Sequence, residues 1–475
     1  MNLLDELFFA LNLRQGAYAT YDRYYRGQQA MGFISAESQR AIGNRLAHLV
    51  VNVPRILVNS LAERCRIIGF DPDASIWDDF IANDLDQQAG IVHRTALLYG
   101  QSFVIVWADA DGNPTVSVES PLNVQVLTDP ATREITAGIK RWSDRAKGET
   151  HAMVYLPDRI EHWRADTARA DASGAFALIE TLPNPLGVVP VVRFLNTDLV
   201  NDAGHWNTDF WGYGHSEIQG VMGLTDALCK VSSDALIASE YLAKPRRWAT
   251  GVELVEIPKM DENNQPVLDG NGEQVMETIN PFPDTDRFML AADPESKFGQ
   301  LSGSSLDGYQ NLADLTLGLI SAVSSLPPHY LGITHANPTS ADALRASEAG
   351  LTSKAADKQS AFGRSWETVG KLMKAVRTGQ AVADIKCRVV WCDPSTRSEA
   401  QAADAVVKLY QAGLLSKSGS LRRLGYSEDE IAAEATARAS EEQNETPMGQ
   451  FYGNQIRTGI AEADAQMASN KAQGY

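Results

Sequence analysis

The chain has few cysteines, few basic residues for its size and no long apolar run. Its four cysteines, Cys65, Cys229, Cys387 and Cys392, are too few and too scattered for the disulfide framework of a small secreted domain. No segment that resembles a signal peptide precedes them, so we expect folding in a reducing compartment. The longest stretch without charged side chains, residues 315–341, is split by two prolines and filled with polar side chains. We therefore expect a soluble protein with no membrane span.

Charge composition limits the kind of nucleic-acid binding that is open to this chain. The 42 basic residues stand against 60 acidic ones, which gives a formal net charge of -18. Tight, non-specific phosphate binding needs clustered Lys and Arg that release counterions. If DNA is a partner, we expect the protein not to grip it. The length of 475 residues, 44% of them hydrophobic, is enough for two to four packed modules.

Motifs of common catalytic sites are missing. There is no GxxxxGK[ST] phosphate loop, no GxSxG elbow and no HExxH helix. The fragment Gly212-Tyr213-Gly214 lacks the third glycine and the preceding βαβ unit of a dinucleotide site. We expect no catalytic residues and no cofactor. A hydrolase whose active site is assembled from residues distant in sequence remains an alternative.

Residues of metal-binding type occur in patterns that favour structural roles. Cys387 and Cys392 have no second cysteine pair or nearby histidine, so we expect buried strand residues, with zinc ligation as the alternative. Asp269 and Asn271 belong to a turn that lacks the glycine and glutamate of a calcium loop, and a hairpin turn is favoured. His329 and His335 share a loop with no carboxylate close in sequence, which favours a polar surface loop over proton transfer or metal binding.

The N-terminal 215 residues predict a β-rich layer flanked by helices. Apolar residues at helical spacing predict a helix from Leu3 to Leu11 and another from Leu46 to Leu61, kinked or restarted at Pro54. Turn residues such as Asp111-Gly112-Asn113-Pro114 separate short runs of strand composition. These runs cover residues 102–107, 115–118, 124–127, 135–142, 152–156, 160–163, 176–181 and 188–194. The fold class is therefore predicted to be α+β.

Two long helices around a small insert follow. Ser216 and Gln219 have capping-box form, which predicts a helix start and a rod that ends at Lys244-Pro245. Residues 245–302 are rich in Pro, Gly and Asn and predict a small lobe with strands at 248–257 and 274–279. A return helix over 303–326 ends at Pro327-Pro328.

The C-terminal third predicts one more long helix, a strand and a helical tail. Residues 339–342 can cap a helix over 340–378, and a strand over 385–391 returns the chain to the sheet layer. From residue 397 the chain is Ala- and Glu-rich and predicts helix with an acidic, mobile end. The basic residues Lys244, Arg246 and Arg247 suit the negative end of the first rod's dipole, and partner binding is the alternative.

This order of elements, together with several local strings, resembles the portal proteins of tailed bacteriophages, in particular the gp6-like portals of siphophages. No single string is diagnostic, but their order and the intervening lengths agree over nearly the whole chain. The strings are Tyr24-Tyr25-Arg26-Gly27, Ile68-Gly69-Phe70, Gly212-Tyr213-Gly214-His215-Ser216-Glu217-Ile218, Leu242-Ala243-Lys244-Pro245-Arg246-Arg247, Leu326-Pro327-Pro328-His329-Tyr330-Leu331-Gly332 and Asn337-Pro338-Thr339-Ser340-Ala341-Asp342-Ala343-Leu344-Arg345.

The resemblance implies a portal fold and a ring of about twelve subunits joined by heterologous contacts. Its parts would be a wing, two stem helices, a clip, a tunnel loop, a long wing or channel helix, a wing strand and a helical crown with an acidic tail. The wing would cover residues 1–215, the stem helices 216–244 and 303–326, the clip 245–302 and the tunnel loop 327–339. The long helix would cover residues 340–378, the wing strand 379–396 and the crown with its tail 397–475.

The resemblance also implies partners and a location. The ring would sit in the virion at one capsid vertex, after assembly in the host cytoplasm, and would pass double-stranded DNA without reading its sequence. Its partners would be the terminase large subunit, the head-tail adaptor, and capsid and scaffold proteins. We expect the tunnel loop to meet DNA through Pro328, His329, Tyr330, His335 and Asn337. We expect partner docking at Lys244, Arg246, Arg247, Asp269 and Asn271. Another ring-forming head-tail connector component is the alternative.

Overall fold

The structure is a computed structural model whose described residues form two compact units. It describes residues 2–30, 49–198, 212–243, 247–250, 255–260, 265–268, 272, 274–279, 295, 297–300, 306–333, 340–395 and 399–441. The first unit comprises residues 1–31, 50–227 and 316–475, and the second comprises residues 32–49 and 228–315. Helices combine with antiparallel strands, in agreement with the predicted α+β class.

Local signals explain the helices at the start of the first unit. The side chain of Asn52 accepts a hydrogen bond from the backbone N–H of Arg55 at 3.3 Å, and Pro54 lies in the first turn that follows. The helix begins at Val53, beside this proline, and residues 49–52 are not helical. Residues 46–48 of the predicted helix lie outside the described residues, so the expected kink or restart stays a prediction. Gly27 ends the second helix with φ 68°, a left-handed conformation suited to glycine. The helices are α1 (Leu3–Leu13), α2 (Gln15–Arg26), α4 (Val53–Glu63), α5 (Ser75–Ala82) and α6 (Leu85–Tyr99).

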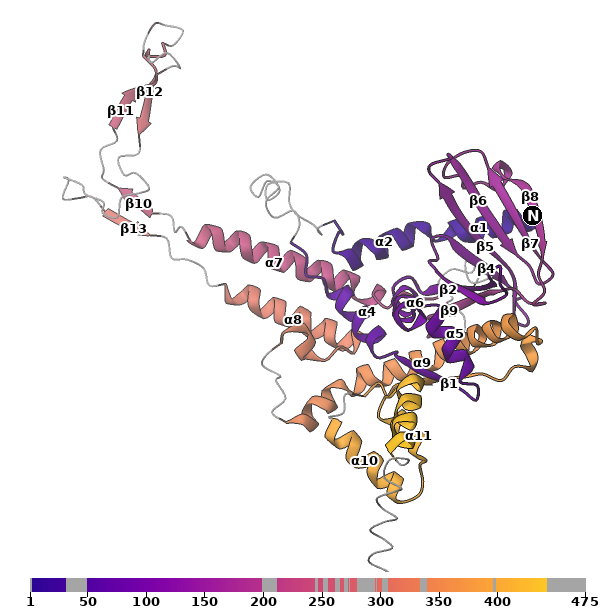
Figure 1. The fold of residues 1–475 in the computed structure, drawn as a ribbon. Coiled ribbons are helices and arrows are strands. Elements are labelled where there is room, and N and C mark those ends of the chain that lie inside the picture. The colour runs from indigo at the N-terminus through magenta and orange to yellow at the C-terminus, as the bar shows by residue number, and fades with distance from the viewer. Residues whose placement is uncertain are drawn as a thin grey trace, which may run out of the picture. The chain divides into compact units, whose positions relative to one another are not determined.

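A five-stranded antiparallel sheet, in the order β4-β5-β6-β7-β8, packs against α1 (Figure 1). Leu7 and Leu11 of α1 meet Ile139 and Val154 of the sheet in one buried cluster. Alternate residues of β6 are buried, as expected for a strand with one face on the core. The strands are β4 (Val124–Thr128), β5 (Ile135–Asp144), β6 (Glu149–Tyr155), β7 (Arg159–Ala165) and β8 (Ala177–Pro183).

Strand β8 is the outer strand of this sheet, and all seven of its residues are exposed. Leu178 and Ile179 are 48% and 49% exposed, and Leu182 is 37% exposed. An edge strand has unpaired backbone groups along one side. Apolar side chains thus occur on this strand beside backbone groups that pair with no further strand among the described residues.

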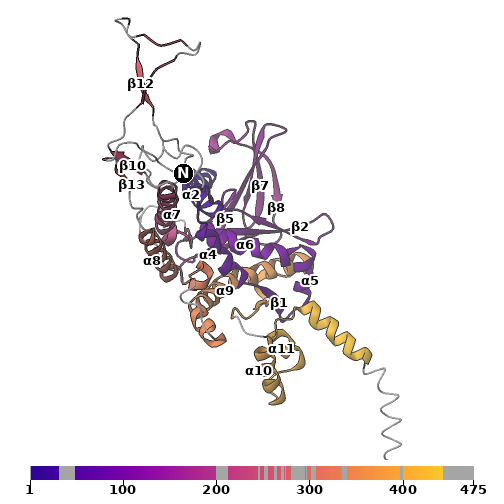
Figure 2. The ribbon, with the colours of Figure 1, turned by 90° about the vertical axis from the view of Figure 1, so that its left-hand side faces the viewer.

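The long helix α9 (Ala341–Thr378) packs against a three-stranded sheet of order β3-β2-β9 and also contacts α4 and α5 (Figures 1 and 2). The sheet consists of β2 (Gln101–Ala108), β3 (Pro114–Glu119) and β9 (Val191–Leu195). Its β2 strand is buried over six consecutive residues. Each of the predicted strand runs between residues 102 and 194 therefore has a counterpart in one of the two sheets.

The predicted strand over 385–391 does not join either sheet. The strand β14 (Arg388–Trp391) pairs instead with β1 (Ile67–Asp71) in a separate two-stranded sheet. This corrects the expected return to the main sheet layer. Cys387 precedes β14 and is buried, and Cys392 follows it and is partly buried. Burial raises the pKa of the Cys387 thiol to about 12, which disfavours the thiolate that zinc binding requires.

The chain segment between the two long rods contains short antiparallel pairs. The strand β11 (Val255–Pro258) pairs with β12 (Met276–Ile279), and β10 (Arg247–Thr250) pairs with β13 (Lys297–Gln300). The single strand expected over 248–257 is thus two strands with different partners. The rods are α7 (Met222–Ala243), preceded by the short helix η3 (Gln219–Val221), and α8 (Asp307–Ser324).

The described C-terminal part is helical, as predicted, and the expected acidic end, after residue 441, lies outside the described residues. Its helices are α10 (Glu399–Gln411) and α11 (Lys417–Arg423), and residues 428–441 are also helical. The indole of Trp77 donates to Asp429 at 3.0 Å, and Arg422 contacts Asp71 at 3.1 Å, so this part is tied to α5 and β1. None of the helices in the described residues combines the length and the apolar composition of a membrane span.

Candidate functional site

The structure describes only part of the residue set predicted from the sequence. Pro328, His329 and Tyr330 lie in the short helix η4 (Pro328–Leu331). His335 and Asn337 lie outside the described residues. So do four of the predicted docking residues, and the fifth, Arg247, is placed only as the first residue of β10. The four are Lys244, Arg246, Asp269 and Asn271.

A compact turn connects the end of α8 to η4. The hydroxyl of Ser324 accepts a hydrogen bond from the Leu326 backbone at 3.2 Å, and the hydroxyl of Ser321 donates to the Leu326 carbonyl at 2.6 Å. The α-helix ends at Ser324, and Ser325 has φ 62°, so the break precedes the two prolines. The prolines cannot resume helical hydrogen bonding because they lack a backbone N–H. Gly332 closes the turn with φ 75°. The first half of the predicted tunnel loop therefore has a defined conformation.

His329 and Tyr330 are held by a buried ion pair. The Arg64 guanidinium lies 3.2 Å from Glu348 of α9 and donates to the Tyr330 hydroxyl at 3.0 Å. The same guanidinium donates to the Pro394 carbonyl at 2.7 Å. The Nε2 atom of His329 lies 3.4 Å from the second oxygen of Glu348. The carboxylate partner that the local sequence did not offer thus comes from the following helix.

The Gly212-Tyr213-Gly214 string forms a close backbone contact. A Cβ atom on Gly214 would lie 2.0 Å from the Gly100 carbonyl oxygen, and one on Gly100 would lie 2.5 Å from the Gly214 backbone. Gly100 also has φ 90°. Both positions therefore require glycine. Arg14, the residue between α1 and α2, donates to the Gly214 carbonyl at 3.1 Å and lies over the Tyr213 ring at 4.6 Å, so it shares in fixing this segment.

Glu217 lies at the centre of a second buried charge cluster. Its two oxygens contact Lys354 at 2.7 Å and Lys358 at 2.8 Å, both on α9. The side chains of Glu217 and Lys358 are each only 5% exposed. Burial opposes the charged carboxylate, but the two ammonium groups outweigh this effect and lower the pKa of Glu217. The start of the first rod is thereby locked to α9.

The expected capping box at Ser216 does not form. The Ser216 hydroxyl is buried and, among the described residues, makes no hydrogen bond, while the α-helix begins only at Met222. Asn196 and the α9 lysines fix this segment instead. The amide of Asn196 donates to the His215 carbonyl at 2.7 Å and to Glu217 at 3.0 Å. Tertiary contacts have replaced a local cap.

The interior of α9 is anchored by an aromatic cluster that the sequence did not predict. The Trp366 indole donates to Nε2 of His93 on α6 at 2.8 Å, and the His93 ring stacks on Phe362 at 5.3 Å. Burial lowers the pKa of His93 to about 3, with a smaller contribution from Arg94. His93 is therefore neutral and acts as a core acceptor. Apolar residues of α6 at positions 85, 89, 92 and 96 recur at helical spacing and could have revealed this element.

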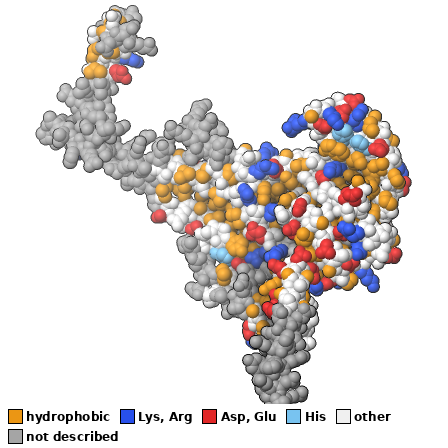
Figure 3. Space-filling model, viewed as in Figure 1, with side chains coloured by type: hydrophobic (Ala, Val, Ile, Leu, Met, Phe, Trp, Pro, Cys, Tyr) orange, Lys and Arg blue, Asp and Glu red, His pale blue; other side chains and the backbone are white. Residues whose placement is uncertain are grey.

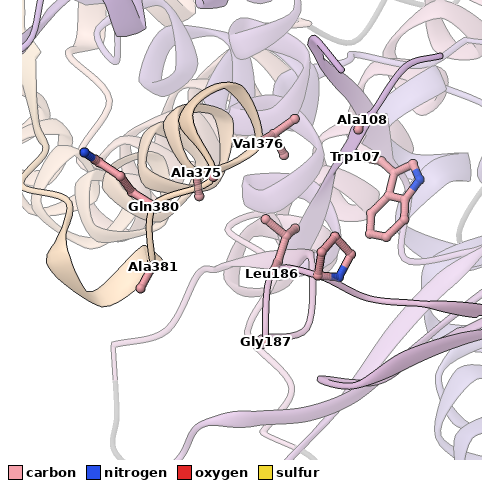
Figure 4. Close-up of a pocket in the computed structure, with 10 residues that line it drawn as sticks. Trp107, Ala108, Leu186, Gly187, Ala375, Val376, Gln380 and Ala381 are labelled. Atoms are coloured by element: carbon pink, nitrogen blue, oxygen red, sulfur yellow. The ribbon is translucent and has the colours of Figure 1, made fainter. Parts of the chain in front are cut away.

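An apolar pocket of about 500 Å³ lies at the other end of α9 (Figure 4). Trp107 of β2, Leu186 and Val376 line it. Its lining contains no acid, base, thiol or hydroxyl side chain, so it offers packing but no general acid–base chemistry.

A pair of histidines occupies the outer surface of the five-stranded sheet. His151 and His162 face each other with ring nitrogens 3.1 Å apart, and Trp142 stacks on His151 at 5.2 Å. Figure 3 shows histidine and hydrophobic side chains together on the sheet surface. Among the described residues, no group of three or more His, Cys, Asp or Glu side chains could hold a metal ion.

Sequence comparisons relate this chain to known proteins. The sequence model of the family "Phage portal protein, SPP1 Gp6-like" matches residues 11–447. The portal protein of Mycobacterium phage L5 is 29% identical over 430 residues, covering 86% of this chain and 82% of that protein. The portal protein of Mycobacterium phage D29 is 28% identical over 446 residues, covering 89% of this chain and 85% of that protein.

Solved structures give a weaker likeness. A chain from the virion of a native gene transfer agent particle matches with a TM-score of 0.42 and 12% identity, covering 86% of this chain and 93% of that chain. A chain from the neck of the native particle, computed with C12 symmetry, has the same score and identity, covering 86% of this chain and 98% of that chain. The family match spans most of the sequence, and the portal family is structural rather than enzymatic. The chain thus belongs to the phage portal protein family, SPP1 Gp6-like, and is a subunit of the portal ring at a capsid vertex.

Proposed function

We propose that about twelve copies of this chain form a closed ring through which double-stranded DNA is packaged and later ejected. The observation that carries the proposal is the family match over residues 11–447. The net charge of -18 supports it, because like charge in a channel keeps a duplex from adhering to the wall. Acidic and basic side chains are interspersed on the face in Figure 3, without a continuous basic surface.

Native mass spectrometry of the purified full-length chain, with electron microscopy of the same sample, tests ring assembly. We expect one closed species near twelve subunits with a central opening. A chain that stays monomeric at every concentration, or rings too narrow for a duplex, would refute the proposal. A short adaptor-like ring without a protruding lobe would instead favour another head-tail connector component.

We propose that residues 327–339 line the channel as a tunnel loop. The loop contains no Asp, Glu, Lys or Arg, so its contacts with phosphates would be weak. The Arg64–Glu348 pair fixes its first residues through His329 and Tyr330. Ser340 fixes its end, because the serine hydroxyl accepts from the Ala343 backbone at 3.2 Å and caps α9. Pro328, His329, Tyr330, His335 and Asn337 would then contact DNA.

We propose that residues 245–302 form a clip that docks the terminase large subunit during packaging and the head-tail adaptor afterwards. The short strand pairs β10–β13 and β11–β12 support a separate lobe of this kind. Lys244, Arg246, Arg247, Asp269 and Asn271 would provide charged and polar docking groups.

The remaining parts of the subunit would be the wing, crown and stem with the predicted boundaries. Assembly in the host cytoplasm, together with capsid and scaffold proteins, completes the proposed role.

A further inference from the structure

A groove of about 400 Å³ lies between α2, α4 and α6 in the first unit. Tyr25 and Arg26, from the string near the N-terminus, both contribute to it. The neighbouring Tyr24 has a separate role, because its hydroxyl donates to Asp226 at 2.6 Å. The other residues that line the groove are Asp22, Arg55, Ile91, Arg94, Thr95, Leu98 and Tyr99.

The groove contains more positive than negative charge. The Arg26 guanidinium pairs with Asp22 at 2.8 Å, and this carboxylate also accepts from the Tyr99 hydroxyl at 3.2 Å. Arg55 lies over the Tyr25 ring at 5.8 Å. Within the described ranges, no carboxylate lies at ion-pair distance from Arg55 or Arg94. Two of the three guanidinium groups are therefore left for a ligand with anionic oxygens.

The size and composition of the groove favour carboxylate side chains of a protein over a nucleic acid. A 400 Å³ groove with Asp22 inside it suits one or two side chains, whereas duplex binding needs an extended basic surface. Exposed Ile91, 48% accessible, adds an apolar contact beside the arginines and tyrosines. Arg and Tyr are enriched at the centres of protein interfaces, and guanidinium groups bind carboxylates in bidentate geometry.

We propose that this groove is a contact between subunits of the ring and that it receives Asp or Glu side chains of a neighbouring copy of the chain. The inference rests on the ring assembly proposed above. With 60 acidic against 42 basic residues, every copy offers carboxylates in excess of its own basic groups. A ring closes by heterologous contacts, in which one surface of a subunit meets a different surface of the next. The groove supplies the basic surface of such a contact.

Charge reversal tests the groove. The double variant Arg55→Glu, Arg94→Glu is compared with Arg133→Glu, Arg145→Glu, which makes the same charge change at exposed positions on sheet hairpins. We expect native mass spectrometry to show at least a tenfold loss of rings in the groove variant alone. Circular dichroism melting of both variants checks that the fold is retained. Rings that persist equally in both variants overturn the proposal.

A zero-length cross-link tests whether the groove contacts a carboxylate of a neighbouring subunit, even if charge reversal disturbs folding. The variant Arg55→Lys, Arg94→Lys keeps both charges, and a carbodiimide joins each new amine to a carboxylate within contact distance. Rings mixed from ¹⁴N and ¹⁵N subunits should give cross-linked peptides that contain both isotopes. Links confined to one subunit overturn the inference.

The same experiments distinguish the proposed subunit contact from DNA binding by the groove and from a failure of ring assembly. Binding of a labelled DNA duplex that charge reversal abolishes, with rings intact, would assign the groove to DNA and overturn the proposal. If the unaltered protein never forms rings, the proposed portal assembly itself is refuted. If the groove variants form rings as well as the unaltered protein, only the role of the groove as a subunit contact is refuted.

Discussion

Glu217 shows how a single buried side chain can tie the segment before a long helix to another helix, α9. It contacts Lys354 and Lys358 while being 5% exposed, so its charge is offset by neighbours rather than by water. A buried ion pair adds little net stability compared with well-packed apolar residues, but its loss from one side is costly. The value of this cluster lies in fixing where the first rod begins relative to α9.

Removing the Glu217 charge should therefore destabilise the first unit. We expect Glu217→Gln to lower the free energy of unfolding by about 2 kcal/mol, because Lys358 loses its buried partner and keeps only Asp198, whose side chain is 72% exposed. Adding Lys358→Met should restore part of this loss, since no buried charge then lacks its partner. Urea unfolding followed by tryptophan fluorescence measures both effects. Lys408→Met, in an exposed pair with Asp404, is the control and should change stability by less than about 0.5 kcal/mol. Equal effects at both sites would contradict the role of Glu217.

His93 predicts a specific acid sensitivity. Its folded pKa of about 3 lies below the ordinary value of 6.5, so the unfolded chain binds a proton that the folded chain excludes. The associated stability is fully present above pH 6.5 and is lost as the pH falls towards 3, by up to about 1.4 kcal/mol per pH unit. His93→Gln keeps an acceptor for the Trp366 indole and removes the titration. The urea midpoint of the variant should fall less steeply between pH 6.5 and pH 4. Parallel slopes would refute this account.

At the scale of elements, we expect the tunnel loop to tolerate shape changes better than added charge. His335→Lys with Asn337→Lys should slow DNA packaging and ejection severalfold, because lysines attract phosphates that must keep moving. Ala146→Lys with Ala168→Lys places the same charge on exposed hairpin positions and should leave the rates unchanged. DNA translocation assays on assembled particles measure this. Normal rates in the loop variant would remove residues 327–339 from the channel.

Local sequence signals, such as turn residues and helix caps, predicted most helices and strands. They did not predict which distant strands pair with each other. The strand runs over 102–194 and the cap at Ser340 were identified because turn residues and caps act over a few positions. The pairing of β14 with β1 joins segments far apart in the chain, and no local pattern specifies it. Helices α5 and α6 were not predicted, although the apolar spacing of α6 was readable.

In the candidate site, too, the sequence predicted local features but not the contacts between distant residues. The sequence identified His329 and Tyr330 as loop residues, yet they are held by Arg64, the residue after α4, and by Glu348 of α9. Ser216 had the residues of a capping box, but contacts with Asn196 and α9 override that local preference. The groove arginines come from three helices, so only the fold brings them together.

At the scale of the whole molecule, the proposed clip should be separable from ring assembly. Deleting residues 262–274 should leave rings of unchanged subunit number, because the first unit has its own buried cores. Binding of the terminase large subunit or of the adaptor to these rings should weaken at least tenfold in pull-down titrations. Rings that bind both partners normally would remove the docking role, and loss of rings would show that the segment serves assembly.

The exposed strand β8 has a practical consequence for subunits that are not yet assembled. Its leucines and isoleucine lie beside unpaired backbone groups, a combination that templates sheet extension between identical molecules. Concentrated stocks of free subunits should scatter light increasingly with time, and a lysine at position 179 should suppress this, as gatekeeper charges do on natural sheet edges. Freshly made chains would then gain from rapid incorporation, before two such edges meet in the wrong register.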